Sequence, residues 1–236
     1  MGLPVIQHPT FFLTLPSTQQ RVSFRPFLVK EEKILLIAQS SEDQTEIVKA
    51  IKQVINNCIT DENVNVEDFT TFDLEYFFIK LRAKSVQNMI ELQYRDNEDK
   101  KVYTVEVDLD QVEVTRPAVV SNIIDVSPTS TITLRYPRLS VMAEVEKLSN
   151  IVDFNFTIMQ ACIESIHDNN TIYKTSDFTQ EEVKQYLDDL DVKTYQKIQE
   201  FIEAMPRVEH TVGYTNSEGK EVKIVLKTLT DFFTLG

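Results

Sequence analysis

A segment of the chain occurs twice, and this internal repeat constrains the fold more than any other feature of the sequence. Residues 90–112 align with residues 210–232 without a gap. The best match joins Tyr94-Arg-Asp-Asn-Glu-Asp-Lys-Lys-Val102 with Tyr214-Thr-Asn-Ser-Glu-Gly-Lys-Glu-Val222. Apolar alternation on both sides of a polar turn is typical of a β-hairpin. Each copy therefore predicts a ribbon of two strands.

The match extends beyond the turn. Val105 aligns with Val225 in the second strand, and an apolar helical stretch precedes each copy, Phe72 to Leu81 in one and Tyr195 to Ala204 in the other. Each copy thus predicts a helix followed by a ribbon. Two copies indicate a duplication at most, because a solenoid needs more units. A chance similarity between two ordinary hairpins is the alternative.

The composition is that of a globular protein. The 236 residues suffice for one large domain or two small ones, and 42% hydrophobic and 26% charged residues are ordinary values. The formal net charge of -13 argues against a general nucleic-acid binder, because phosphate repels an acidic surface. The first residues fit neither a signal peptide nor a myristoylation site, and no stretch is long and apolar enough to span a bilayer. We therefore expect a cytosolic protein without a membrane span.

The remaining segments alternate between hairpin and helix patterns. Two short strands, Phe11 to Leu15 and Arg21 to Arg25, precede a helix from Val29 to Gln39. Ser41 or Asp43 is expected to cap a second helix, in which Ile47, Val48, Ile51, Val54 and Ile55 form an apolar stripe.

The middle of the chain is read in the same way. We expect an irregular connector over Val119 to Ser130, then a strand, two helices and a short strand: Thr131 to Tyr136, Ser140 to Leu148, Ile151 to His167, and Thr171 to Tyr173. A capping box of Thr179 and Glu182 begins the next helix. Segregated hairpins and helices favour an α+β fold over a wound parallel sheet.

Four segments follow from this pattern. Residues 1–60 form an N-terminal hairpin with two helices, and residues 61–116 form the first helix-ribbon unit. Residues 117–176 contain a strand and the central helices, and residues 177–236 form the second helix-ribbon unit.

Residues suited to catalysis or to cofactor binding are scarce. The chain has four glycines, too dispersed to build a loop around phosphate or a dinucleotide. Cys58 and Cys162 stand alone in apolar surroundings, typical of buried hydrophobic side chains. His167 has one other metal ligand at helical spacing, Glu164, and two ligands do not make a zinc site. We therefore expect no cofactor, no metal and no catalytic residue.

Two charged groups leave alternatives open. The acidic run at Asp188, Asp189 and Asp191 fits a solvated helix boundary, and a hydrolase would require one of these acids to be buried beside another. A group of basic residues with interleaved aromatic residues is consistent either with a surface that binds an acidic partner or with a solvated face of the hairpin. Its members are Arg21, Phe24, Arg25, Phe27, Lys30 and Lys33.

Several strings, in series, resemble one family. They are Phe24-Arg-Pro-Phe-Leu-Val-Lys-Glu-Glu-Lys-Ile-Leu-Leu36, Ala50-Ile-Lys-Gln-Val-Ile-Asn-Asn-Cys-Ile59, Thr71-Phe-Asp-Leu-Glu-Tyr-Phe-Phe-Ile-Lys-Leu-Arg-Ala-Lys-Ser-Val86, Leu134-Arg-Tyr-Pro137, Phe201-Ile-Glu-Ala-Met-Pro-Arg-Val-Glu-His210 and Asp231-Phe-Phe233. In this order the chain resembles the baseplate hub assembly proteins of T4-type contractile-tailed bacteriophages.

The resemblance implies a late viral protein made in the host bacterial cytoplasm, which helps to build the baseplate hub and either stays in the virion baseplate or leaves it. Its expected partners are other phage baseplate hub and tail proteins, and its expected role is non-enzymatic. The alternative from another class is a cytosolic chaperone or protease adaptor with no virion role. A carboxylate-dependent hydrolase is the third hypothesis.

Six residues are predicted to contact a partner. Four of them begin the first family string and combine aromatic with basic side chains, as interface anchors often do: Phe24, Arg25, Phe27 and Lys30. Phe232 and Phe233 form an apolar tail near the end of the chain. The alternative is that these phenylalanines fill the local core.

Overall fold

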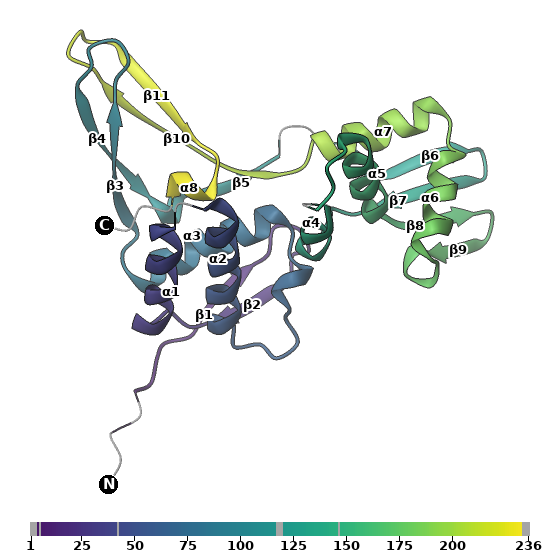
Figure 1. Ribbon diagram of the computed structural model, residues 1–236, viewed down its shortest axis with the longest axis horizontal. Helices are drawn as coiled ribbons and strands as arrows, with labels where there is room; N and C mark the ends of the chain where they lie inside the picture. Colours follow the sequence, from purple (N-terminus) through teal and green to yellow (C-terminus); the bar gives the residue numbers. More distant parts are fainter. Residues whose placement is uncertain (1–3, 5, 42, 117–119, 146, 233–236) are drawn as a thin grey trace. The chain divides into compact units, whose positions relative to one another are not determined.

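The structure is a computed structural model that describes residues 4, 6–41, 43–116, 120–145 and 147–232 (Figure 1). The chain forms two compact units. Unit 1 contains residues 1–66, 71–115 and 207–236, and unit 2 contains residues 67–70 and 116–206. Each unit combines helices with antiparallel strands, which confirms the α+β class.

The N-terminal part of unit 1 is the predicted hairpin followed by helices. Strands β1 (Phe11–Thr14) and β2 (Arg21–Phe24) pair, and α1 (Val29–Ser40), α2 (Gln44–Cys58) and α3 (Thr71–Ser85) follow. The segment between α2 and α3 contains a 3₁₀ turn at Val66–Asp68, whose last two residues belong to unit 2. The Asp43 carboxylate caps α2 by accepting a hydrogen bond from the Thr45 backbone N–H at 2.8 Å. Aromatic side chains from β2 and α3 fill the core between these elements: Phe24, Phe72, Phe77 and Phe78 are each at most 2% exposed.

Two ribbons complete unit 1. The first ribbon is β3 (Met89–Arg95) with β4 (Val102–Asp108), and the second is β10 (Arg207–Thr215) with β11 (Glu221–Leu226). A 3₁₀ turn at Leu109–Gln111 leads from β4 to β5 (Glu113–Thr115), which pairs with the start of β10. The last described element is α8 (Leu229–Phe232). The ribbon tips extend away from α1, α2 and α3 (Figure 1).

Unit 2 is a four-stranded antiparallel sheet with helices. Its strands follow the order β6 (Ile123–Ser127), β7 (Ser130–Leu134), β8 (Ile163–Asp168) and β9 (Thr171–Lys174). The helices are α4 (Leu139–Val145), α5 (Ile151–Cys162), α6 (Gln180–Asp188) and α7 (Val192–Glu203), with a 3₁₀ turn at Thr175–Asp177 before α6. The Thr179–Glu182 capping box at α6 is confirmed.

Two expectations about unit 2 were wrong. The expected connector contains strand β6 over Ile123–Ser127, and Val119 lies outside the described residues. The expected helix from Ile151 ends at Cys162, because Ile163, Ser165 and the residues after them pair with β7 as strand β8. In Ile163-Glu-Ser-Ile-His-Asp the two isoleucines are three residues apart, a spacing that continues a helical pattern, so the local sequence does not reveal the strand.

The helix that precedes the second ribbon does not accompany it. Helix α7 belongs to unit 2, where Ile198 and Phe201 lie in the same core as strand residues Ile132 and Ile163, whereas the second ribbon belongs to unit 1. The duplication predicted from the sequence therefore describes the ribbons and does not extend to the helices.

Candidate functional site

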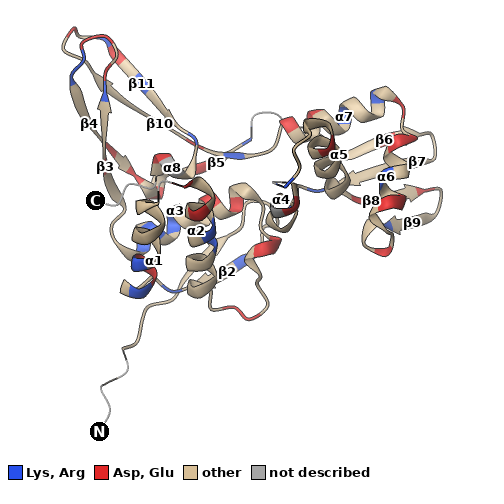
Figure 2. Cartoon of the chain, in the orientation of Figure 1, with Lys and Arg blue, Asp and Glu red and all other residues tan. Residues whose placement is uncertain are grey.

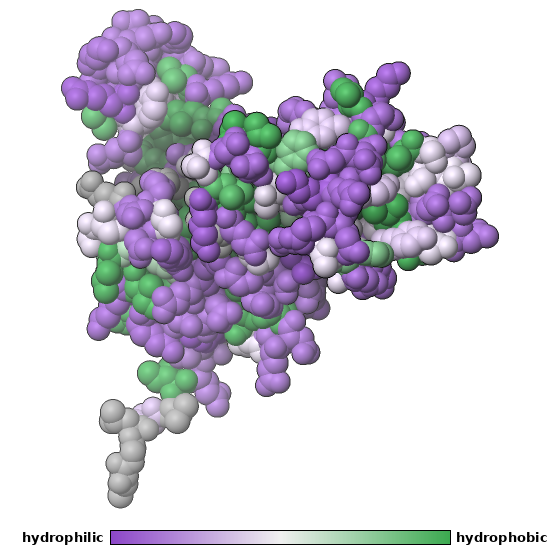
Figure 3. All heavy atoms as spheres, turned by 45° about the vertical axis from the view of Figure 1, so that its right-hand side comes forward, coloured by the Kyte–Doolittle hydropathy of each residue, from purple (hydrophilic) through white to green (hydrophobic). Residues whose placement is uncertain are grey.

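The two ribbons pack against each other within unit 1. Ile90 and Val107 of the first ribbon share a buried cluster with Val208 and Leu226 of the second, and Phe232 of α8 closes it. Further along, Leu92, Val212 and Ile224 pack on this cluster as half-buried side chains. Figure 3 shows hydrophilic side chains at the tips and hydrophobic ones lower along the ribbons. The pair is thus a small two-layer arm with its own apolar interior.

Aromatic rings join the two ribbons near their tips. The rings of Tyr103 and Tyr214 stack with centroids 4.5 Å apart, and Tyr94 lies 5.8 Å from Tyr214 in a tilted arrangement. The Tyr214 hydroxyl donates to Asp96 Oδ2 at 2.8 Å, which fixes the second ribbon to the turn of the first. Sequence reasoning aligned Tyr94 with Tyr214, and the fold brings these equivalent residues into contact.

Polar groups continue the contact at the tips. Asp99 Oδ2 accepts from the Ser217 hydroxyl at 2.7 Å and from the Tyr103 hydroxyl at 2.5 Å. Lys220 forms an ion pair with Glu98. Acidic and basic residues from both ribbons therefore meet here (Figure 2). We call these residues the tip cluster: Tyr94, Asp96, Glu98, Asp99, Tyr103, Tyr214, Ser217 and Lys220.

These contacts determine the protonation of the tip cluster. Hydrogen bonds from the Glu98 backbone N–H and from the Tyr214 hydroxyl lower the pKa of Asp96. The Tyr103 hydroxyl and further donors lower the pKa of Asp99 well below its usual range. Burial and the Asp96 carboxylate raise the pKa of the Tyr214 hydroxyl. The Asp96 and Asp99 carboxyls are therefore charged, and the Tyr214 hydroxyl is neutral, at neutral pH.

The turns of the two ribbons have equivalent hydrogen bonds but differ in length. Asp96 Oδ1 accepts from the Glu98 backbone N–H at 2.6 Å, and Asn216 Oδ1 accepts from the Glu218 backbone N–H at 3.0 Å. Each turn also has one residue with positive φ: Lys100 (63°) in the first and Gly219 (79°) in the second. The first turn follows the Arg95–Val102 pair and the second follows the Thr215–Glu221 pair, so the second is one residue shorter.

This missing residue corrects the ungapped alignment in the second strand. Val105 is buried at 5% exposure, whereas its sequence partner Val225 is 41% exposed. A shift of one residue turns a strand's side chains to the other face. The structural counterpart of Val105 is therefore Ile224, which points into the arm, and Leu226 takes the place of Val107.

The residues predicted to bind a partner lie mainly in the core of unit 1. Phe24 and Phe27 are 2% and 7% exposed, and the Phe24 ring lies 5.2 Å from that of Phe77. Phe232 is 1% exposed inside the ribbon cluster, and Phe233 lies outside the described residues. The alternative that these phenylalanines fill the local core therefore describes Phe24, Phe27 and Phe232.

The two basic members of that group lie beside the buried carboxylate of Glu31. Arg25 donates to Glu31 Oε1 at 3.0 Å and to the Asn57 carbonyl at 2.9 Å. Glu31 is fully buried; burial acts to raise its pKa, but hydrogen bonds from Arg25 and from the Leu28 backbone N–H outweigh burial and lower it. Lys30 has an exposed side chain 3.5 Å from Glu31, and its role in binding stays a prediction.

The acids considered for hydrolysis are exposed. Asp188 and Asp189 lie at the end of α6 on the surface, and Asp191 caps α7 by accepting from the Thr194 backbone N–H at 2.8 Å. The condition that the hydrolase hypothesis placed on them, burial beside another acid, is not met by these three residues.

The histidine considered as a metal ligand lies on a strand, and both cysteines are buried in the core. His167 lies on β8 and is 3.0 Å from the Ser165 hydroxyl, and the described residues contain no group of three potential metal ligands. Cys58 and Cys162 are buried, and burial raises the pKa of their thiols to about 11 and about 12. Both thiols are therefore protonated and unreactive at neutral pH.

One unusual group escaped the sequence reasoning. Burial raises the pKa of the Glu75 carboxyl in α3 to about 7. The available signal was an acid flanked by Leu74 and Tyr76 and followed by the apolar run Phe77-Phe-Ile79. Tyr76 and Ile79 of the same helix pack against the ribbon cluster, so this titrating group belongs to the layer that supports the arm.

None of the helices in the described part of the chain has the length and apolar character needed to cross a bilayer. A search of curated proteins and a search of solved structures each gave no significant match. The family described as T4 bacteriophage base plate protein matches residues 8–234, which includes both units and both ribbons. A family match over this range implies contacts with other phage baseplate proteins, and it covers nearly the whole chain. The chain therefore belongs to the T4 bacteriophage base plate protein family.

Proposed function

We propose that this baseplate protein acts in the hub of the contractile tail, as an assembly factor or as a hub subunit, and that it works through protein–protein contacts without catalysis. The observation that carries the proposal is the family match over nearly the whole chain. The resemblance of the serial strings to hub assembly proteins supplies the finer assignment.

The arrangement of side chains supports a binding role. The paired ribbons form a projecting arm whose charged and aromatic groups are used to join the ribbons, and the acids considered for catalysis are helix caps or surface residues. A two-ribbon arm presents a preformed surface, which lowers the entropic cost of binding. We place its synthesis and action in the host bacterial cytoplasm, where tails assemble.

Affinity purification of the tagged protein from phage-infected cells, with mass spectrometry of the eluate and of purified virions, tests the proposal. Hub proteins in the eluate with no copies in virions identify an assembly factor, and copies in both identify a hub subunit. An eluate with baseplate proteins of the periphery but none of the hub contradicts the hub assignment. An eluate dominated by a host protease or by unrelated clients favours the adaptor alternative instead.

A further inference from the structure

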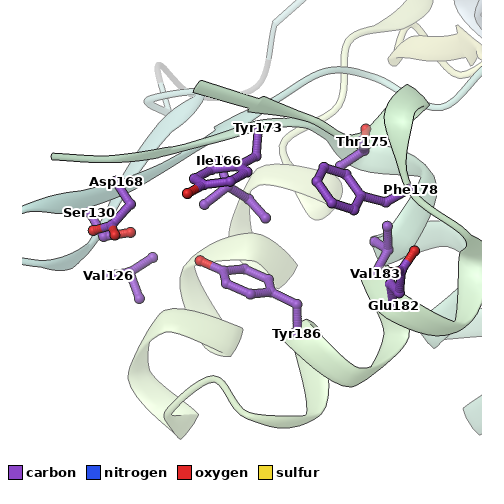
Figure 4. Close-up of a pocket in the computed structure, with 10 residues that line it drawn as sticks. All are labelled: Val126, Ser130, Ile166, Asp168, Tyr173, Thr175, Phe178, Glu182, Val183 and Tyr186. Carbon is purple, nitrogen blue, oxygen red and sulfur yellow. The ribbon is translucent and has the colours of Figure 1, made fainter. Parts of the chain in front are cut away.

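A cavity opens beside the free edge of the sheet in unit 2. It has a volume of about 560 Å³ and lies between the sheet and α6. Figure 4 shows its lining, in which three aromatic rings surround the space. The lining residues come from strands, from the turn after β9 and from α6: Val126, Ser130, Ile166, Asp168, Tyr173, Thr175, Phe178, Glu182, Val183 and Tyr186.

The cavity has an acid at each end. Glu182 is engaged in the capping box of α6, where its Oε2 accepts from the Thr179 backbone N–H at 2.8 Å. Asp168 lies at the other end, beside Ser130, and the hydroxyl of Tyr186 points toward this end (Figure 4). Within the described residues, no hydrogen bond or ion pair engages the Asp168 carboxylate. A half-buried carboxylate without a counter-charge favours a cationic ligand.

The aromatic lining of the cavity favours contact with the methylene groups of a basic side chain. Tyr173 and Phe178 have ring centroids 6.2 Å apart and are 41% and 44% exposed, so they form the mouth of the cavity. Tyr186 lies across from Tyr173, deeper in the space (Figure 4). Arginine and lysine bury their methylene stems on apolar surface and keep the charged group in polar surroundings. An arginine also stacks on aromatic rings, so it fits this lining best.

The adjacent strand offers a backbone partner. Strand β9 is the last strand of the sheet, all four of its residues are exposed, and its pairing with β8 is regular from Thr171 to Lys174. Strand β6 at the other edge has a register shift between Asp125 and Ser127, and such bulges protect edges from pairing. An extended segment added to β9 places every second side chain on the face of Tyr173.

We propose that unit 2 binds an extended, basic segment of a partner protein, which pairs with the β9 edge and inserts an arginine side chain into the cavity beside Asp168. The formal net charge of -13 favours a basic partner as well. The site is a largely apolar cavity with one half-buried acid, Asp168, that has no ion-pair partner among the described residues, and it specifies both the backbone conformation and the side chain of its ligand. The inference concerns this site alone and does not depend on a role in the hub.

Binding of synthetic peptides to the full chain tests the site. The probe is the peptide acetyl-Thr-Val-Thr-Arg-Thr-Val-Thr-amide, and its counterpart has citrulline in place of arginine, which removes the charge and keeps the shape. We expect the arginine peptide to bind at least about tenfold more tightly by calorimetry, because a hydrogen bond to a charged group is lost in the counterpart. Amide shifts in a ¹H–¹⁵N spectrum are expected on β9, the following turn and α6.

Variants separate the parts of the proposal. Asp168→Asn is expected to remove the preference for arginine over citrulline, whereas Asp125→Asn, an equal charge change on β6 of the same sheet, keeps it. Tyr173→Ala alters an exposed side chain and is expected to weaken both peptides. An arginine peptide with N-methylated backbone tests edge pairing and is expected not to bind.

Equal affinity for the arginine and citrulline peptides overturns the assignment of the cation to Asp168. Binding of the N-methylated peptide with unchanged affinity overturns the pairing with β9. No binding of the arginine peptide at millimolar concentration, or shifts confined to unit 1, overturns the site as a whole.

Discussion

The two ribbons of unit 1 have similar sequences and different structural supports. The first follows α3 within its own unit, whereas the second follows α7, which packs Ile198 and Phe201 into the core of unit 2. The first turn is one residue longer than the second, and this single residue decides which side chains of β11 point inward. Similar sequence therefore specifies the ribbon itself, and turn length together with the partner ribbon specifies its faces.

The largest expected effect comes from an equal substitution at two aligned positions. Val105→Asp places a charge in the interior of the arm and is expected to lower the free energy of unfolding by about 3 kcal/mol or more, since buried charges without partners are costly. Val225→Asp is expected to cost less than about 1 kcal/mol because this side chain is 41% exposed. Urea unfolding of both variants measures the difference. Equal losses of unfolding free energy in the two variants would mean that Val105 and Val225 are equally buried, as the ungapped alignment implies.

The next effect concerns the helix that supports the ribbons. Burial raises the folded-state pKa of Glu75 to about 7, above its value of about 4.5 in the unfolded chain, so stability is present below pH 4.5 and is lost as pH rises toward 7. Glu75→Gln is therefore expected to stabilise the protein by about 1–3 kcal/mol at pH 8 and to have little effect near pH 4. Unfolding curves at both pH values provide the measurement, and a gain that does not vary with pH would exclude titration of Glu75 as its cause.

Aligned tyrosines give a smaller and more specific contrast. Tyr214→Phe removes the hydrogen bond to Asp96, and we expect the Tm to fall by about 2–4 °C. Tyr94→Phe is the matched control, because the described residues give its hydroxyl no hydrogen-bond partner, and we expect its Tm to stay within about 1 °C of the unmodified protein. Calorimetric scans of the two variants compare them. A larger loss in Tyr94→Phe would mean that the tips are joined in another way.

The smallest effect is the pH dependence of the tip cluster. Contacts in the folded state lower the pKa of Asp96 and Asp99, so their contribution is present above the pKa of the unfolded carboxylates and is lost as pH falls through the folded-state values. We expect the amide signals of Glu98 and Ser217 to broaden or shift in acid before the rest of unit 1 unfolds. Asp99→Asn is expected to abolish the part of this change that follows Asp99.

Much of this fold was predictable from local patterns. The hairpin at Phe11, the capped helices at Asp43 and Thr179 and the strands of each ribbon follow from periodicity and capping residues, which act within a few positions of the chain. Strand β8 was mistaken for the end of a helix because its identity depends on pairing with β7, a contact between distant residues.

The candidate site was less predictable for the same reason. The burial of Phe24 and Phe232 depends on which elements cover them, and an aromatic residue beside an arginine has the same local pattern at an interface and in a core. Asp168 lies on a strand and Tyr186 on a helix, in separate segments of the sequence. Only the fold places both side chains in one cavity. The tip cluster likewise joins residues whose alignment suggested equivalence and did not indicate contact.

The pairing of the two ribbons is the central claim, and a nuclear Overhauser spectrum of the protein with labelled tyrosines tests it most directly. The stacked arrangement, with centroids 4.5 Å apart, predicts cross-peaks between the ring protons of Tyr103 and Tyr214 that disappear in Tyr214→Ala. Folded ribbons without any cross-peak between these rings would show that the two ribbons do not pair, and would contradict the account.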